Sequence, residues 1–279
     1  MHLLTMAIVI TAAILFRLQT VPTLGNWSGR WYRTLFLFCL PGLLMLTTAV
    51  TVLYMGCHGQ MLGVQAGSVG CLLSLGLILF AVASWLRLVY RSYRSLRQIR
   101  RYPQQQIGKM MARIFELDLP YSAQVGFWQS ELIISRGLLA TLDTEHLTAV
   151  MAHERAHAQY RDTFWFFWLG WIRSFSFWLP NTEALWQELL LLRELRADCK
   201  AAESVDFLLL AESLLAVAKA PLESPAGCIG FNDAQTGDRL QARIDSLLNQ
   251  SESIENRRWQ HWSWLSWLFL PLLTIPLHY

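Results

Sequence analysis

Long apolar runs separated by short polar connections dominate the first third of the chain. Residues 3–16, 34–54 and 69–86 are almost continuously hydrophobic. At 1.5 Å of rise per residue, the second and third runs extend about 27–32 Å as helices, which matches the hydrocarbon core of a bilayer. The first run is short, but it has no positive region before it and no small-residue cleavage site after it, so we interpret it as a retained span. The pattern predicts three N-terminal transmembrane helices.

Two more apolar segments lie later in the chain. Residues 262–277 contain two prolines, and tryptophans gather at their start, as is typical of the headgroup level of a membrane. We therefore expect a C-terminal transmembrane helix within residues 259–279, with an interfacial hairpin as the alternative. Residues 164–179 are crowded with aromatic side chains around Arg173, which favours a helix in the membrane interface or against the bundle over a lipid-exposed span.

The central part of the chain, residues 102–258, has the mixed pattern of one soluble α+β domain. Residues 124–128 and 131–135 predict two short strands around a polar pair, and so a small β-hairpin with an edge strand. Residues 220–232 are rich in proline and glycine and predict a loop, and residues 239–248 predict a helix after it.

Composition supports a membrane protein independently of the apolar runs. Hydrophobic residues make up 54% of the 279 residues and charged residues only 15%, whereas an ordinary soluble domain has about 25% charged residues. We therefore expect a mainly α membrane protein. Its parts are a transmembrane region at residues 1–101, the central domain at 102–258 and a C-terminal membrane segment at 259–279.

The arginines indicate how the spans are oriented. Arg17, Arg30 and Arg33 follow the first run, whereas residues 55–68 carry no charged side chain apart from any protonation of His58. A basic run follows the third span, comprising Arg87, Arg91, Arg94, Arg97, Arg100, Arg101 and Lys109. By the positive-inside rule, the amino terminus lies outside and the central domain is cytoplasmic. The basic run is expected on a continuing helix that faces anionic headgroups; with a net charge of +3, nucleic-acid binding is not expected.

The pentapeptide His153-Glu154-Arg155-Ala156-His157 indicates a reaction centre. On an α-helix, positions i and i+4 differ by about 40°, so both imidazoles project from one face toward one ion, for which Zn²⁺ is the candidate. Glu154 then lies beside the metal, where its carboxylate takes a proton from water bound to the metal, as the general base of a metallopeptidase does. Asp143 is a suitable N-cap for this helix. Because the pattern also arises by chance, its context decides.

A catalytic zinc requires three protein ligands and an open fourth position, which predicts a carboxylate on a second helix. Glu194 and Asp198 share one helical face, so Glu194 can ligate while Asp198 accepts the second N–H of a ligating histidine. Asp162, five residues after the second histidine, is a candidate for the same support. The alternative is that Glu194 and Asp198 form a solvated, salt-bridged face. His146 lies about 10 Å along the axis from His153, too far to ligate the same ion.

At this point the sequence resembles a known family. The H-E-x-x-H-x-x-x-x-D of residues 153–162, an aromatic stretch and R-E-L-R-A-D at residues 193–198 are similar to the BlaR/MecR-type integral-membrane zinc peptidases. The resemblance covers roughly residues 121–202 and the helix around 239–248. It implies a gluzincin-like domain whose metal ligands are His153, His157 and Glu194 and whose catalytic base is Glu154. Antibiotic sensors of that family carry an extracellular penicillin-binding domain, and no such domain follows the last apolar run, so sensing of β-lactams by that route is not expected.

The resemblance implies an endopeptidase in the inner (plasma) membrane of a bacterium. Its target would be a cytoplasmic protein, either a DNA-binding repressor or its own chain, cut as a transmembrane signalling step. In zinc peptidases of this architecture, an edge strand beside the active helix binds substrate as an added strand, and one of the two predicted strands is the candidate. The candidate residues are Gln124, Val125, Gly126, Phe127, Trp128, Glu131, Leu132, Ile133, Ile134 and Ser135. The expected partners are lipids and a peptide substrate, without direct nucleic-acid contact; the oligomeric state stays open.

Two other functions stay open at this stage. An HtpX-like or prenyl-protease-like quality-control protease shares both motif helices, but such proteins generally place two full spans between them, where this chain has one aromatic segment. A non-catalytic signalling scaffold with a relic site is the other, although all four chemical positions are present. Tyr160 and Arg193 lie near the ligands in sequence, and neither can be assigned as the partner of the oxyanion.

The five cysteines do not show the spacing of a metal site. Cys57 and Cys71 flank the loop between the second and third spans, where both a disulfide in an oxidising compartment and ordinary apolar packing are open. Met55, Cys57, His58 and Met61 bring soft and borderline donors together in that loop. Binding of Cu(I) there as an input signal is one hypothesis, and chance residues at the end of a span are the alternative.

Overall fold

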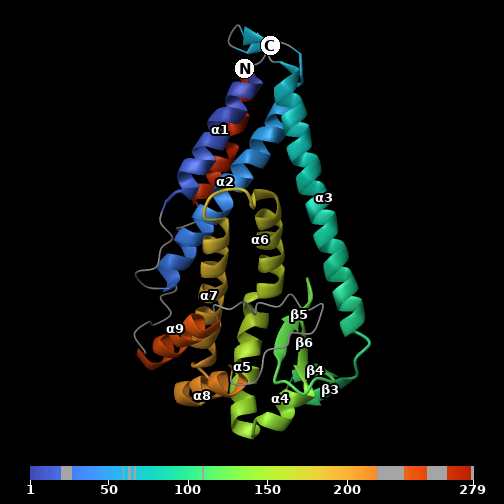
Figure 1. The fold of residues 1–279 in the computed structure, drawn as a ribbon, viewed down its shortest axis with the longest axis vertical. Coiled ribbons are helices and arrows are strands. Elements are labelled where there is room, and N and C mark those ends of the chain that lie inside the picture. The colour runs from blue at the N-terminus through green and yellow to red at the C-terminus, as the bar shows by residue number, and fades with distance from the viewer. Residues whose placement is uncertain are drawn as a thin grey trace. The chain divides into compact units, whose positions relative to one another are not determined.

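The computed structural model describes residues 1–19, 27–58, 60–61, 64–65, 67–108, 110–218, 236–249 and 263–277 (Figure 1). Its helices are α1 (His2–Arg17), α2 (Trp27–Met55), α3 (Ser68–Ile99), α4 (Arg136–Thr141), α5 (Thr144–Tyr160), α6 (Asp162–Ser176), α7 (Thr182–Ala201), α8 (Phe207–Ala218), α9 (Thr236–Asn249) and the 3-10 helix η1 (Ser263–Leu277). Its strands are β1 (Gln60–Met61), β2 (Val64–Gln65), β3 (Gln104–Ile107), β4 (Met110–Phe115), β5 (Ser122–Val125) and β6 (Glu131–Ser135). The loop expected at residues 220–232 and Cys228 lie outside the described residues.

The chain forms two compact units that are interleaved along the sequence. The first consists of Met1–Leu88, Leu169–Leu190 and Glu255–Tyr279, and the second of Val89–Trp168 and Leu191–Ile254. Three of the four divisions fall inside α3, α6 and α7, and the fourth, between Ile254 and Glu255, lies outside the described residues. The sequence had suggested contiguous parts with boundaries near residues 101 and 258.

In the first unit, α2 packs against α1 and η1. A buried cluster of Ala13, Met45 and Leu179 joins segments that are far apart in sequence. Arg17, at the end of α1, is fully buried, and its Nη2 donates to Phe38 O at 2.9 Å while Nη1 donates to Thr182 Oγ1 at 3.1 Å. These bonds hold α1, α2 and α7 together at one place.

Two helices of the described chain are long and apolar enough to cross a membrane, namely α2 and α3. The expected spans at residues 34–54 and 69–86 lie within them, and α3 continues to Ile99, so most of the basic run is on the same helix as expected. The first and last apolar runs form α1 and η1, which are apolar but shorter than such a span. The structure therefore supports two of the four expected crossings by length and composition.

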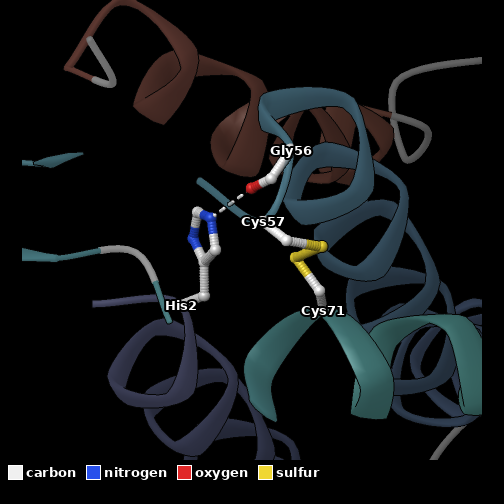
Figure 2. The surroundings of a disulfide bond; sticks show 4 residues. All are labelled: His2, Gly56, Cys57 and Cys71. Carbon is white, nitrogen blue, oxygen red and sulfur yellow. Dashed lines mark hydrogen bonds between the residues drawn. A yellow bond between two sulfur atoms is a disulfide. The ribbon is translucent and has the colours of Figure 1, made fainter. Parts of the chain in front are cut away.

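A disulfide joins Cys57, just after α2, to Cys71 in the first turn of α3 (Figure 2). Beside it, His2 Nε2 donates to Gly56 O at 2.9 Å. The sequence left this pairing open, and the structure forms it. With its sulfur in the disulfide, Cys57 is not available as a thiolate ligand for Cu(I). Binding of Cu(I) by the other donors of the loop stays a hypothesis.

The second unit contains a four-stranded sheet in the order β3-β4-β6-β5. The β4–β6 pair is parallel, and the β3–β4 and β5–β6 pairs are antiparallel. The predicted hairpin is present as β5 and β6, but β3 and β4 were not expected. Residues 104–106 are three glutamines without apolar alternation, which explains why the sequence pattern did not show a strand there.

Only one of the two candidate edge strands has a free edge. β6 lies between β4 and β5, and residues 132–134 are paired on both sides, so β6 cannot accept a substrate strand. β5 pairs with β6 alone among the described residues. The expected strand at residues 124–128 starts two residues earlier and ends at Val125. At Gly126, φ is +135° and a Cβ would lie 2.3 Å from Gln129 O, so the chain bends away from the sheet.

The aromatic segment expected at residues 164–179 forms α6 from Asp162 to Ser176. In the second unit, its first turns pack against the end of the β5–β6 hairpin. Phe127 lies 5.0 Å from Phe164 and 4.8 Å from Phe167, measured between ring centroids. In the first unit, Arg173 of this helix pairs with Glu183 at 2.5 Å, which satisfies the internal charge that the sequence analysis noted.

The helix α5 is wedged between two apolar clusters of the second unit. On one side, Val150 joins a cluster of sheet residues and residues of α4. On the other, Ala149 packs with residues of α7, α8 and α9. Asp143 caps the helix as expected, since its side chain accepts from His146 N at 2.9 Å. This packing fixes the rotation of α5 and turns His153, Glu154 and His157 inward, where all three are buried.

Candidate metal centre

The histidines of α5 and the glutamate of α7 converge on one point. His153 Nε2 and His157 Nε2 are 3.0 Å apart. Glu194 Oε2 lies 3.3 Å from the first of these nitrogens and 3.5 Å from the second. In a tetrahedral zinc site with bonds of about 2.0–2.2 Å, the donor atoms are about 3.3–3.6 Å from one another. The two distances to Glu194 lie within this range, and the distance between the imidazole nitrogens is slightly shorter. The three donors are therefore close enough to share one ion and leave a fourth position open.

A carboxylate holds the other nitrogen of each imidazole. His153 Nδ1 lies 2.8 Å from Asp198 Oδ1, and His157 Nδ1 lies 2.7 Å from Asp162 Oδ2. The contact at His157 is a hydrogen bond, in which Nδ1 donates to the carboxylate, so Nε2 of this ring presents a lone pair. The contact at His153 is close, but its Nδ1 has no hydrogen-bond partner of suitable geometry among the described residues. Two ring nitrogens that face one another at 3.0 Å repel unless a cation or a proton lies between them. The structure thus places Asp198 and Asp162 where the sequence had put them.

The tight turn between α5 and α6 explains the place of Asp162. Arg161 adopts the left-handed conformation with a φ of 54°, and its N–H bonds to Ala158 O at 3.1 Å. The helix therefore stops at Tyr160, and Asp162 begins α6 next to His157 rather than continuing around α5. A left-handed conformation costs a non-glycine residue about 1–2 kcal/mol, which the surrounding contacts must offset.

The centre is electrostatically suited to a cation. Burial by itself would lower the pKa of His153, but the charge of Asp198 and the contact with Glu194 raise it to about 9. The pKa of Glu194 is well below its usual range; burial opposes this shift, and the charges of Arg193 and His157 outweigh burial. Buried carboxylates that stay ionised draw positive charge to the imidazoles. The donor set, its spacing and its charge fit a zinc ion.

Arginines balance the carboxylates behind the ligands, and the sequence analysis did not assign the most important of them. Arg243 of α9 donates from Nε and Nη2 to the two oxygens of Asp198 at 2.7 and 2.8 Å. Its Nη1 lies 3.6 Å from Glu194 Oε2. The predicted helix at residues 239–248 carried the signal for Arg243, but nothing in the sequence paired it with Asp198.

The sequence analysis named three further residues near the ligands, and the structure shows the contacts of each. Arg193 donates to Glu194 Oε1 from Nε at 2.8 Å and from Nη2 at 2.6 Å, so it orients the carboxylate of the third expected ligand. The ring of Tyr160 lies under the guanidinium of Arg196, 4.2 Å from its carbon. His146 interacts with its own cap, Asp143, at 2.8 Å and is not among the three converging donors, in agreement with its expected place.

Glu154 is buried beside the ligands, and its two oxygens differ. Oε1 accepts a hydrogen bond from Ser122 Oγ at 2.7 Å. Oε2 is buried and has no hydrogen-bond partner within the described part of the chain. An ionised oxygen that is shielded from water and not bonded is costly unless a ligand or substrate uses it. Ser122 was missed by the sequence analysis, because a serine 32 residues upstream has no local pattern that marks it.

Residues 110–217 match the model of peptidase family M48. The M48 match extends from β4 to α8 and includes both motif helices and β5. Peptidases of family M48 depend on a metal, typically zinc, so the match and the converging donors together support a metallopeptidase of a membrane type. The M48 match does not support the BlaR/MecR type specifically.

We expect Arg243→Gln to weaken zinc binding about 10- to 100-fold, the range found when a partner of a metal ligand is removed. The reason is that Asp198 loses its bidentate partner and no longer holds His153 in one orientation. Competition with a chelator of known zinc affinity measures the change. Arg239→Gln, one turn earlier on α9, is the matched control. Equal zinc affinity of the two variants would contradict the role of Arg243.

Proposed function

We propose that this protein is a membrane-bound zinc endopeptidase with its active site on the cytoplasmic side. The observation that carries the proposal is the convergence of His153, His157 and Glu194, near which the buried Oε2 of Glu154 has no hydrogen bond to the described residues. The M48 match supports the same class of enzyme. Zinc held by the three donors would polarise the scissile carbonyl and acidify water.

The residues of the chain account for the remaining steps. Glu154 Oε2 accepts a proton from the attacking water and later gives it to the leaving amine. Asp198 and Asp162 keep the imidazoles in one tautomer, and Arg243 keeps Asp198 ionised and in place. β5 offers its free edge to an extended peptide, which pairs with it as an added strand. Main-chain pairing makes cleavage depend on an unfolded segment more than on its sequence.

Insertion in a membrane is supported by the surface of α3. Its apolar window is only 22% buried, and large side chains such as Leu72, Leu79 and Leu86 are 55–65% exposed. A monomeric soluble protein rarely exposes an apolar surface of this length to water. Lipid chains are the partner that this surface fits.

Two observations support the membrane orientation that we propose. The disulfide between Cys57 and Cys71 requires an oxidising compartment, which lies outside the inner membrane. The arginines of the last turns of α3 are typical of the cytoplasmic side. If α3 crosses the membrane, its Cys71 end is outside and its Arg97 end is inside, and the second unit starts in the cytoplasm.

We expect a membrane-impermeant maleimide to report this topology in spheroplasts that carry a Cys228→Ser variant. Cys57 and Cys71 should be labelled from outside only after reduction of their disulfide. Cys199 on α7, which is not part of the disulfide, should be labelled only after permeabilisation. Labelling of Cys199 in intact spheroplasts would contradict the proposed orientation.

The substrate that we propose is a cytoplasmic DNA-binding repressor, or the chain itself, cut in a flexible linker as a signalling step. The proposal is supported by the single 15-residue helix α6 between α5 and α7, where a quality-control protease of the HtpX-like kind would have two full spans. A signal would enter through the membrane, the outer loop or a partner protein. The central domain lies in the cytoplasm in the proposed topology, so an external signal cannot reach it directly.

We expect co-expression with a repressor encoded beside this chain to yield a truncated repressor under inducing conditions. The Glu154→Gln variant should leave the repressor intact, because it lacks the base. Immunoblotting of an epitope-tagged repressor measures both results. Cleavage that persists in the variant, with other proteases deleted, would assign the cut to another enzyme; cleavage of misfolded membrane proteins in its place would favour quality control.

A further inference from the structure

One hydrogen bond determines how the carboxylate of Glu154 is used. Oε1 accepts from Ser122 Oγ at 2.7 Å, whereas Oε2 is buried and unbonded in the described part of the chain. The last torsion of a glutamate side chain has a broad energy well, so a carboxylate without an anchor samples many orientations. The bond to Ser122 therefore leaves one defined oxygen to accept a proton.

The backbone at Ser122 is held firmly by the core. Ser122 begins β5 and pairs with Ile134, which is fully buried in β6. Just before it, Tyr121 N donates to Ser135 Oγ at 2.9 Å, and Ser135 N donates to Tyr121 O at 2.9 Å. Ser135 Oγ also donates to Leu119 O at 2.7 Å. The hydroxyl that anchors the base thus rests on a rigid support, as a preorganised site requires.

We propose that Ser122 is a positioning residue, which aligns Glu154 for proton transfer and couples that alignment to substrate binding at β5. This inference rests on the proposed peptidase function. The hydroxyl keeps its own proton throughout, donating it to Oε1. Oε2 takes one proton from the attacking water and returns it to the leaving amine, so the protons balance over one turnover.

The coupling follows from the place of Ser122 in the sheet. Ser122 lies on β5, which is an outer strand of the sheet and pairs with β6 alone among the described residues. A peptide that pairs with β5 adds hydrogen bonds along it and so restricts the motion of the residue that orients the base. An extended substrate then helps to complete the catalytic geometry, whereas a small ligand at the metal does not.

Ser122→Thr and Ser122→Val form the matched pair that tests the inference. The two side chains have the same shape and both suit a strand, but only threonine keeps the hydroxyl. With the zinc-loaded full-length protein in detergent micelles and fluorescein-labelled casein as substrate, we expect Ser122→Thr to keep most of kcat. Ser122→Val should lower kcat about 10- to 100-fold, the effect of losing a hydrogen bond to a charged group. KM and zinc content should change little in both, and Ser130→Ala, in the β5–β6 turn, should behave as wild type.

A second readout does not depend on activity. In the metal-free protein, a double-mutant cycle with Ser122→Ala and Glu154→Ala on the melting temperature should show coupling, because either substitution removes the same bond. Additive shifts in this cycle, or equal kcat values for the threonine and valine variants, would overturn the role of Ser122. Those results leave the peptidase itself intact. A wild-type protein that shows no zinc-dependent cleavage would instead remove the proposed function, and this inference with it.

Discussion

Glu154→Gln is expected to retain about one zinc ion per chain and to lose proteolysis by about 10²–10⁴-fold. The amide can still accept the hydrogen bond from Ser122, so the shape of the site is kept, but it cannot accept a proton from water at neutral pH. Since Glu154 is not one of the three converging donors, zinc should remain. Elemental analysis and cleavage of labelled casein measure the two quantities on the same preparation.

Two comparisons make this result specific to the base. His157→Ala should lose both zinc and proteolysis, because it removes a donor from the centre. Glu145→Gln, at an exposed position in the first turn of α5, should change neither. Loss of zinc from Glu154→Gln would show that this carboxylate is a ligand and would undo the assignment of its role.

Glu194→Ala is expected to weaken zinc binding by more than about 100-fold, since removal of a partner behind a ligand already costs about 10–100-fold. Two imidazoles rarely suffice for a zinc site in a protein. In addition, Arg193 and Arg243 would be left near the imidazoles without the carboxylate that now balances them. Titration with zinc against a competing chelator gives the affinity, and the loss of proteolysis should follow it.

Glu188→Ala is the control on the same helix. Glu188 pairs with Arg30 at 2.6 Å in the first unit and contributes no donor to the centre. Its removal should lower the stability of that unit while zinc affinity stays close to that of the wild type. Equal losses of zinc affinity in the two variants would place the third ligand elsewhere.

The motif residues were predictable because the helix is a local structure. Positions i and i+4 share a face whatever the rest of the chain does, so His153 and His157, and likewise Glu194 and Asp198, could be paired from spacing alone. The cap at Asp143, the helix at residues 239–248 and strand β6 were also predicted correctly, since caps and apolar patterns act over a few residues. The two long apolar helices follow from the same kind of local signal.

The arrangement of these local pieces was decided by tertiary structure. The sheet order made β6 an interior strand and β5 an outer strand, because β4 pairs with β6 across 20 residues of sequence. Ser122 reaches Glu154 over 32 residues and Arg243 reaches Asp198 over 45. A periodic sequence pattern cannot reveal contacts between residues so far apart along the chain, since loop closure and core packing bring these groups together.

The sequence by itself determined which chemical groups are paired locally: two imidazoles and a glutamate on one helix, a carboxylate pair on another, and apolar helices of membrane length. Only the tertiary structure decided how the centre is held, through the bond from Ser122 to Glu154 and the two bonds from Arg243 to Asp198. It also decided that Cys57 and Cys71 form a disulfide in the first unit. The physical reason is that donor types and helical spacing are properties of a few neighbouring residues. Orientation, charge balance and the free strand edge arise only when distant segments pack against one another.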